Sequence, residues 1–119
     1  MQDFHKLSVW QKAHRLTVRI YNVTNTFPKG ELYGLTSQIR RAAVSIPANI
    51  SEGCGRAGQA ELGRFLLIAM GSASELEYHV LLARDLEFLK EADYSELNGK
   101  ILEIKRMLSA LIIKLKTEN

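Results

Sequence analysis

The sequence lacks several features that would place the protein outside the reducing interior of a cell. Its one cysteine, Cys54, cannot form an intramolecular disulfide bond, and nothing suggests an oxidising compartment. The amino-terminal residues have no apolar segment typical of a signal peptide, and no run approaches the roughly 18 apolar residues of a membrane span. These absences favour a cytoplasmic protein that has no membrane-spanning segment.

The sequence also lacks the motifs of common catalytic and metal sites. A di-iron bundle needs Glu-x-x-His, but the position three residues before His79 is Leu76. The glycines around Cys54 are not followed by the Gly-Lys-Ser/Thr of a phosphate loop, and no activating base for this thiol is visible. We therefore expect no enzyme activity, no cofactor and no metal.

The central stretch, residues 38–55, has the pattern of a buried helix. Apolar residues recur every three or four positions, as one face of a helix requires, at Leu35, Ile39, Ala42, Ile46 and Ile50. The pattern continues through Pro47, which costs about 3 kcal/mol in an ordinary helix interior. A pattern on both sides of a proline predicts one helix kinked at Pro47, closed by Gly53 and Gly55.

Three further helices are expected from the same periodicity. The first begins near Ser8 and stops at Phe27-Pro28, and Glu31 and Leu32 open the central one. A loop over residues 53–58 leads to a third helix over residues 59–89. A connection over residues 90–94 leads to a fourth over residues 95–116, capped by Ser95. No strand pattern occurs. Residues 1–119 therefore predict a single all-α domain, an antiparallel up-down-up-down four-helix bundle.

The third helix is apolar over a wider arc than one bundle core requires. Its first stripe predicts the core face and consists of Leu62, Phe65, Ala69, Ala73, Leu76, Val80 and Ala83. A second stripe contains Leu67, Met70, Tyr78 and Leu81. We interpret this second stripe as a subunit interface, which makes the protein a homo-oligomer. The small residues at positions 71–74 would let another helix approach closely, or could equally be a local weak point of the helix.

Positive charge is concentrated in the first half of the chain. Residues 1–58 hold 8 Lys/Arg against 3 Asp/Glu, whereas residues 59–119 hold 8 against 10. This asymmetry is compatible with a surface that binds nucleic acid, or with two charged faces that recognise one another. The candidate nucleic-acid-binding residues are Lys12, Arg15, Arg19, Arg40, Arg41, Arg56 and Arg64.

Some of these candidates also have a structural interpretation. Lys12, Arg15 and Arg19 share one stripe of the first helix, where they could meet phosphates. Arg40 or Arg41 could instead pair with Glu52, Glu75 or Glu77, an interpretation that we favour slightly for Arg41. Trp10 and Tyr21 could stack on bases, although aromatic residues at helical spacing are more often part of a core.

Several motifs along the chain resemble those of one bacterial family. They are Leu7-x-x-Trp10-x-x-Ala13, Gln38-Ile39-Arg40-Arg41-Ala42, Ser45-Ile46-Pro47-x-Asn49-Ile50-x-Glu52-Gly53 and Ala69-x-Gly71-Ser72-x-x-Glu75-Leu76-Glu77. This combination resembles the 23S-rRNA-intervening-sequence proteins, and the resemblance covers nearly the whole chain. It implies a four-helix bundle that assembles into a ring-like homopentamer. It also implies similarity to the accessory variability determinant protein of diversity-generating retroelements, which partners a reverse transcriptase and binds nucleic acid.

The resemblance and the charge pattern together suggest a non-enzymatic, oligomeric module that binds RNA or ribonucleoprotein. The alternative is a scaffold that docks a partner protein without binding nucleic acid. The motif residues Pro47, Asn49, Glu52 and Gly53 are interpreted as structural. Asn49 would satisfy a backbone group freed by Pro47, and Glu52 would pair with an arginine.

Overall fold

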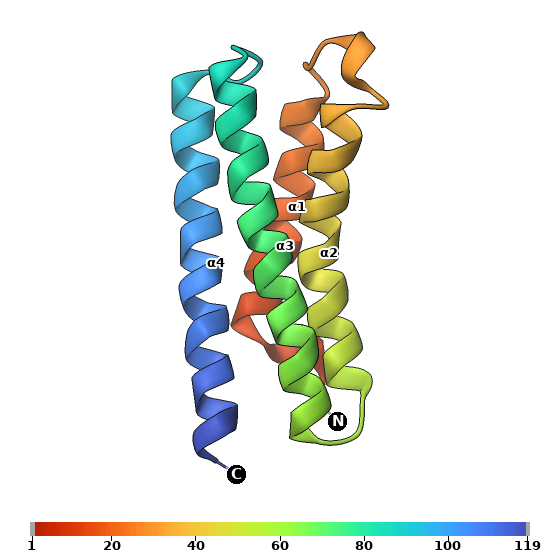
Figure 1. The fold of residues 1–119 in the computed structure, drawn as a ribbon, viewed down its shortest axis with the longest axis vertical. Coiled ribbons are helices and arrows are strands. Elements are labelled where there is room, and N and C mark those ends of the chain that lie inside the picture. Colours follow the sequence, from red (N-terminus) through yellow and green to blue (C-terminus); the bar gives the residue numbers. More distant parts are fainter. Residues whose placement is uncertain (1, 119) are drawn as a thin grey trace.

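The computed structural model describes residues 2–118 and consists of four α-helices in a bundle measuring 47 × 23 × 20 Å (Figure 1). The helices are α1 (Ser8–Thr24), α2 (Leu35–Gly55), α3 (Gln59–Asp85) and α4 (Glu91–Thr117). Two short 3-10 helices, η1 (Phe4–Lys6) and η2 (Lys29–Glu31), precede α1 and α2. The described part of the chain contains no strand, so the prediction of an all-α four-helix bundle is confirmed.

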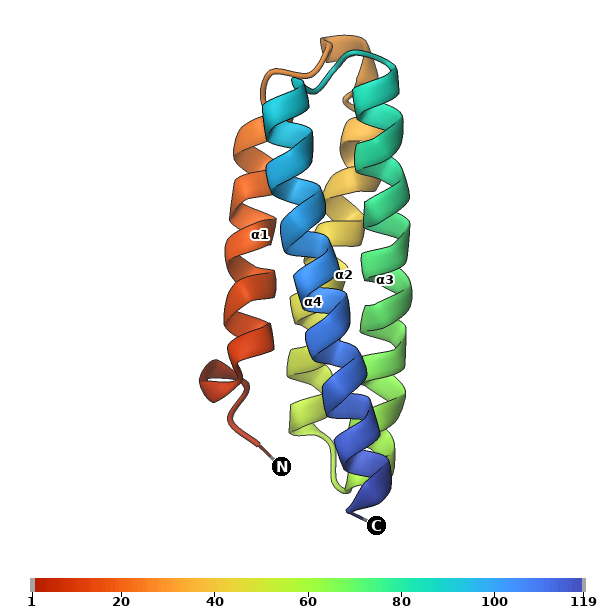
Figure 2. The same cartoon turned by 90° about the vertical axis from the view of Figure 1, so that its left-hand side faces the viewer.

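The four helices surround one core. Each packs against two neighbours, in the order α1, α2, α3, α4 and back to α1. Figures 1 and 2 show both termini and the α2–α3 connection at one end of the bundle, with the other two connections at the opposite end.

The core stripes predicted for α2 and α3 are buried throughout. So is the apolar face that the same spacing predicts for α1, which consists of Val9, Ala13, Leu16, Ile20 and Val23. For α4, apolar spacing predicts a core stripe of Leu97, Ile101, Ile104, Leu108, Leu111 and Leu115. Leu111 is only half-buried, and Ile112 takes its place in the core.

The start of α2 differs from the expectation. We expected Glu31 and Leu32 to open this helix, but Glu31 ends η2 and the α-helix begins at Leu35. The Leu35 amide donates to Oε1 of Glu31 at 3.1 Å. Glu31 therefore satisfies an amide at the helix start that would otherwise lack an acceptor, and acts as a side-chain cap from the preceding turn.

α2 continues through Pro47 as one helix, and the backbone group that this proline frees has a partner. Pro47 has no amide proton to donate to the carbonyl of Ala43, four residues earlier. Oγ1 of Thr17, on α1, lies 3.1 Å from that carbonyl oxygen and 2.8 Å from the carbonyl oxygen of Ala13. The interpretation of Asn49 as the compensating residue is therefore wrong, because the compensation comes from a neighbouring helix.

Asn49 instead joins a polar contact between α2 and α3. Its amide donates to the carbonyl oxygen of Ser45 at 2.7 Å and to Oγ of Ser45 at 2.9 Å. The Ser45 hydroxyl lies 2.8 Å from the hydroxyl of Ser72 on α3. Two residues further along α2, Oγ of Ser51 donates to the carbonyl oxygen of Pro47 at 2.9 Å.

Gly53 lies at a close contact between α2 and α3. A Cβ atom at this position would be 2.9 Å from Cβ of Phe65 and 3.1 Å from Cδ1 of Leu62. Gly53 is inside α2, which ends at Gly55, so the connection to α3 is shorter than the expected loop over residues 53–58. The role of Gly53 is close packing, because only a residue without a side chain fits there.

α3 ends four residues before the expected Leu89, in a Schellman motif without glycine. The amide of Phe88 donates to the carbonyl of Ala83, and that of Glu87 to the carbonyl of Arg84, each at 2.9 Å. Glu87 has a left-handed φ of 65°, a position usually taken by glycine. Sequence reasoning missed this end because no glycine marks it.

α4 begins earlier than expected. The expected cap, Ser95, lies inside the helix, which starts at Glu91 and includes most of the predicted 90–94 connection. Glu91 and Asp93 lie in its first turn, where carboxylates interact favourably with the positive end of the helix dipole.

By length and composition alone, α3 could also cross a membrane, with a mean hydropathy of 1.2 over its most apolar window. Its core stripe is buried against the other helices of the bundle. A core helix of a soluble bundle passes the same test, so this is weak evidence for a membrane span.

Candidate nucleic-acid interface

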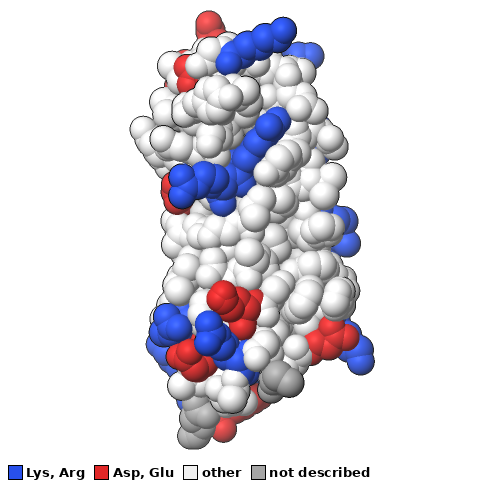
Figure 3. Space-filling view, turned by 90° about the vertical axis from the view of Figure 1, so that its right-hand side faces the viewer, with Lys and Arg blue, Asp and Glu red and all other residues white. Residues whose placement is uncertain are grey.

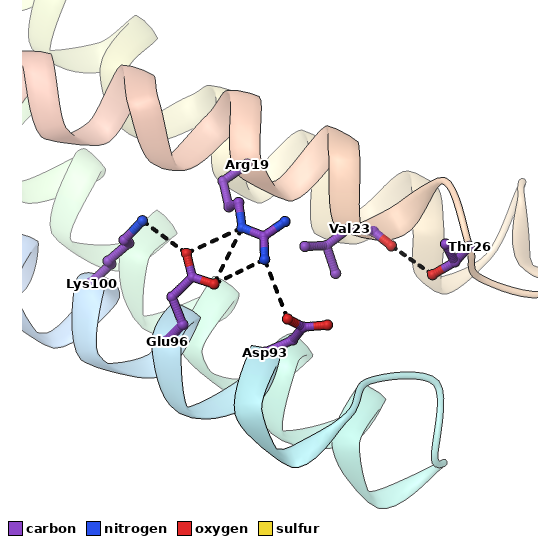
Figure 4. Close-up of polar contacts among 6 residues, drawn as sticks. All are labelled: Arg19, Val23, Thr26, Asp93, Glu96 and Lys100. Atoms are coloured by element: carbon purple, nitrogen blue, oxygen red, sulfur yellow. Dashed lines mark hydrogen bonds and ion pairs between the residues drawn. The ribbon is translucent and has the colours of Figure 1, made fainter.

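Two of the three basic residues predicted to form a stripe on α1 are bound to carboxylates of α4. Nζ of Lys12 lies 3.1 Å from Oε2 of Glu103. The guanidinium of Arg19 is 2.9 Å from Glu96 and 3.3 Å from Asp93 (Figure 4). The basic first half of the chain thus meets the acidic second half across the α1–α4 contact. The charge asymmetry left two alternatives, a nucleic-acid-binding surface or two charged faces that recognise one another. The second alternative accounts for Lys12 and Arg19.

Glu96 is the centre of this network. It accepts hydrogen bonds from Arg19 and also from Nζ of Lys100 at 3.0 Å. These donors stabilise the charged carboxylate and lower the pKa of Glu96 from 4.5 to about 2. The same contact raises the pKa of Arg19. The network therefore carries full charge at neutral pH and links α1 to α4.

Arg15, the third member of the predicted stripe, is exposed and has no ion pair or hydrogen bond among the described residues. It lines a small cleft of about 140 Å³ between α1 and α4, together with Lys12 and Lys100. Arg15 is therefore the one residue of that stripe whose guanidinium remains available to a ligand.

The two arginines of α2 have different environments. Arg40 holds the end of α1, donating to Oγ1 of Thr24 at 2.9 Å and to Oδ1 of Asn25 at 3.1 Å. Its guanidinium also covers the ring of Tyr21, 4.7 Å from the centroid. Arg41 is exposed and, within the described chain, has neither an ion pair nor a hydrogen bond. The ion pair that we favoured for Arg41 is thus not formed.

Arg41 lies in an open cleft between α2 and α3 with a volume of about 260 Å³. The cleft is lined by Gln38, Arg41, Ala42, Ser45, Ser72 and Glu75. Charged and neutral hydrogen-bonding groups face the same space. The cleft is therefore mainly polar and lies beside the motif residue Ser45.

The last two candidate arginines flank one aromatic ring near the α2–α3 connection. The guanidinium of Arg56 lies 5.2 Å from the ring centroid of Phe65, and that of Arg64 lies 4.5 Å from it. Arg56 also pairs with Glu52 at 3.7 Å, as the interpretation of Glu52 anticipated, and Arg64 pairs with Glu61 at 3.1 Å. Both arginines are therefore neutralised locally.

Figure 3 views the molecule from the side on which α2 lies. Lys and Arg residues appear there in small separate groups, several next to Asp or Glu, and uncharged residues fill most of the face. Lys and Arg residues do not form one continuous basic surface on this side.

Two buried side chains, His79 and Cys54, have shifted pKa values. The described residues contain no group of three His, Cys, Asp or Glu side chains placed to hold a metal. Burial lowers the pKa of His79, whose Nε2 is 3.6 Å from Glu75 and whose buried Nδ1 has no hydrogen-bond partner. Burial raises the pKa of the Cys54 thiol, which makes it less nucleophilic at neutral pH.

The predicted interface stripe of α3 faces outward. Leu67 is 56% exposed and Tyr78 is 59% exposed, whereas Met70 and Leu81 are half-buried. Gly71 lies between Leu67 and Tyr78 on this face, and a Cβ atom there would meet no atom within 4 Å. The small residues at positions 71–74 thus include one that no helix of the same chain approaches.

Comparison with known proteins places the chain in a family. A sequence model described as 23S rRNA-intervening sequence protein matches residues 5–110. The chain belongs to this family. A crystal structure from Bacteroides thetaiotaomicron, of a protein with unknown function from the S23 ribosomal protein family, is similar at a TM-score of 0.79 and 30% identity. The similarity covers 87% of this chain and 97% of the other. No curated protein matches the sequence.

The predicted motifs around Pro47 and Gly71 meet at the α2–α3 contact, through the hydroxyl groups of Ser45 and Ser72. Sequence reasoning missed other basic residues that lack partners, such as Lys6, and missed the rings that surround Trp10. The sequence feature that could have indicated the rings around Trp10 is His14, which follows it by one helical turn.

Proposed function

We propose that this protein is a non-enzymatic RNA-binding module that acts as a homopentamer in the cytoplasm. The proposal rests on an excess of basic side chains that have no partner within the described part of the chain. Among the described residues, only two carboxylates make neither an ion pair nor a hydrogen bond, Glu87 and Glu91. Seven basic side chains make neither: Lys6, Arg15, Lys29, Arg41, Lys90, Arg106 and Lys116.

The surplus of unpaired cations favours a polyanionic partner. Cations without an intramolecular carboxylate can pair with phosphates without first breaking a contact. In a pentamer the surplus is repeated five times, so the field around the assembly exceeds that of one chain. The description of the family links it to ribosomal RNA, which makes RNA the preferred polyanion.

The test measures RNA binding as a function of salt. A labelled single-stranded RNA is titrated with the protein at about 50 and about 200 mM salt, with fluorescence anisotropy as the readout. We expect the Kd to rise at least tenfold across this range, because phosphate contacts release counterions. Absence of binding at the lower salt concentration, or binding that salt does not weaken, would contradict the proposal.

Two matched variants separate specific cations from net charge. Arg15→Gln with Arg41→Gln removes two unpaired cations, and Lys12→Gln with Lys105→Gln removes two that pair with Glu103 and Glu77. We expect the first pair to weaken RNA binding several-fold more than the second. Equal losses would show that only the overall charge matters.

A second candidate function is a scaffold for a partner protein. The exposed apolar residues of α3 favour it, because patches of this kind mark protein interfaces. Purified protein that retains a protein partner but no RNA would support this alternative.

A further inference from the structure

Four aromatic rings gather where the amino-terminal segment meets α1. Phe4 stacks on His5 with centroids 4.1 Å apart, and Trp10 lies 4.8 Å from Phe4. The imidazole of His14 is parallel to the indole of Trp10, with an interplanar angle of 2° and centroids 5.2 Å apart. We refer to Phe4, His5, Trp10 and His14 as the aromatic cluster.

Hydrogen bonds hold the amino-terminal part of the aromatic cluster in place. Oδ1 of Asp3 accepts from the amide of His5 at 3.1 Å and lies 2.8 Å from its Nδ1. Nε2 of Gln11, on α1, donates to the carbonyl of His5 at 2.8 Å. The amide of Gln2 donates to the carbonyl of Cys54, at the end of α2. The rings are therefore ordered before any ligand arrives, which lowers the entropy cost of binding.

The aromatic cluster is open to solvent on its imidazole side. Phe4 and Trp10 are half-buried, whereas His5 and His14 are exposed. One face of the His14 ring lies against Trp10, which leaves the other face available. Two of the seven unpaired cations, Lys6 and Arg15, directly follow the two histidines in the chain.

Three other aromatic rings, those of Tyr21, Phe65 and Tyr94, are already covered by cations. Arg40 covers Tyr21, Arg84 lies 4.3 Å from the centroid of Tyr94, and two arginines flank Phe65. Their faces are unavailable without displacing a guanidinium. Tyr33 and Tyr78 are exposed and uncovered, but neither has a parallel ring behind it. His14 differs because one face of its ring is supported by the parallel indole of Trp10.

We propose that the aromatic cluster binds unpaired nucleotides of RNA, with a base stacked on the free face of His14. This inference rests on the proposed function and specifies where the RNA binds and in what form. Arg15 lies about 100° further round the helix and binds the adjoining phosphate, with Lys6 available to another. Bases within a duplex are already stacked on their neighbours, so the site selects single strands.

The protein carries its own probe for this site, because Trp10 is its only tryptophan. An oligoadenylate of about 12 nucleotides, labelled with fluorescein, reports binding anywhere on the protein through its anisotropy. Unlabelled oligoadenylate is titrated in parallel while the emission of Trp10 is recorded. We expect saturable quenching of this emission with the same Kd, and weaker binding when the strand is annealed to its complement.

Substitutions at His14 distinguish stacking from charge. His14→Ala removes the ring and is expected to weaken binding about tenfold and to reduce the quenching. His14→Phe keeps a ring without the imidazole and should restore both. Lys29→Ala is the control for charge, because it removes an unpaired cation at the opposite end of the bundle (Figure 1). It should leave the quenching unchanged. Circular dichroism checks that each variant is folded.

The outcomes separate this inference from the proposed function. Binding that leaves the emission of Trp10 unchanged, or that His14→Ala does not weaken, overturns the aromatic site while RNA binding stands. Failure of His14→Phe to restore binding overturns stacking as the mechanism. No change in anisotropy at low salt contradicts the proposed function, and the inference fails with it.

Discussion

Thr17 and Pro47 show how a residue that disfavours a helix is accommodated inside one. The hydroxyl of Thr17 lies against the Ala43 carbonyl that Pro47 leaves without an amide donor. We expect Thr17→Val, which removes the hydroxyl at nearly constant shape, to lower the free energy of unfolding by about 1–3 kcal/mol. Urea unfolding followed by circular dichroism measures this difference.

A double-mutant cycle provides the control. In the Pro47→Ala background the residue at position 47 has an amide proton for the Ala43 carbonyl, so the cost of Thr17→Val should be smaller. An equal cost in both backgrounds would show that Thr17 contributes through packing alone.

The sequence predicted the proline inside the helix but not its compensation. Periodicity places Pro47 on a buried face, because the apolar spacing continues on both sides of it. It does not specify which residue of another helix lies beside the freed carbonyl. Thr17 is 26 residues away from Ala43 in the chain, and Asn49 was the nearer polar residue. Contacts between elements depend on how the helices are rotated and offset, which local spacing does not determine.

The helices themselves were predictable, and their ends were less so. The core face of a helix follows from its apolar spacing, which is why the core stripes of α1, α2 and α3 were predicted correctly. The start of α2 depends on Glu31 acting from the preceding turn, and the end of α3 depends on Glu87 adopting a left-handed conformation. Neither residue type usually marks these positions, so the sequence had no signal for them.

The contact between α1 and α4 should make stability depend on pH. The folded-state pKa of Glu96, about 2, is below its ordinary value of 4.5. Its contribution is therefore fully present above about pH 4.5 and is lost as the pH falls toward 2. Glu96→Gln should lower the free energy of unfolding by about 1 kcal/mol at pH 7, a modest amount because the pair is partly exposed.

The same variant should reduce the loss of stability between pH 4.5 and pH 3, measured by urea unfolding. Glu118→Gln is the control, because its contact with Lys114 is long, at 4.0 Å, and both side chains are largely exposed. If the two variants lose stability with the same pH dependence, Glu96 is not the group that links α1 to α4 electrostatically.

The candidate site was only partly predictable, because the role of a basic residue depends on what faces it. Arg15 and Arg19 have the same residue type and the same predicted stripe, yet only Arg19 meets carboxylates of α4. These carboxylates lie more than 70 residues away in the chain. Carboxylates from distant parts of the chain pair with some basic residues and leave others free. The basic residues available to a ligand are therefore scattered over the molecule and do not form the predicted stripe.

The outward face of α3 gives a prediction for the assembly as a whole. Leu67 and Tyr78 leave large apolar surfaces in solvent, and Gly71 between them leaves room for another backbone to approach. We expect light scattering of the purified protein to give a mass near five chains. Leu67→Glu or Tyr78→Glu should reduce it to one chain, because a carboxylate cannot be buried unpaired in an interface.

The bundle itself should tolerate these changes, because both side chains are exposed in the single chain, so circular dichroism should be unchanged. Val18→Glu is the matched control, since Val18 is an apolar residue of α1 that is 50% exposed. It should leave the mass near five chains, because it lies away from α3. A monomeric wild type, or a Leu67→Glu variant that still assembles, would show that α3 does not hold the subunits together. Its exposed face would then be free for a partner protein.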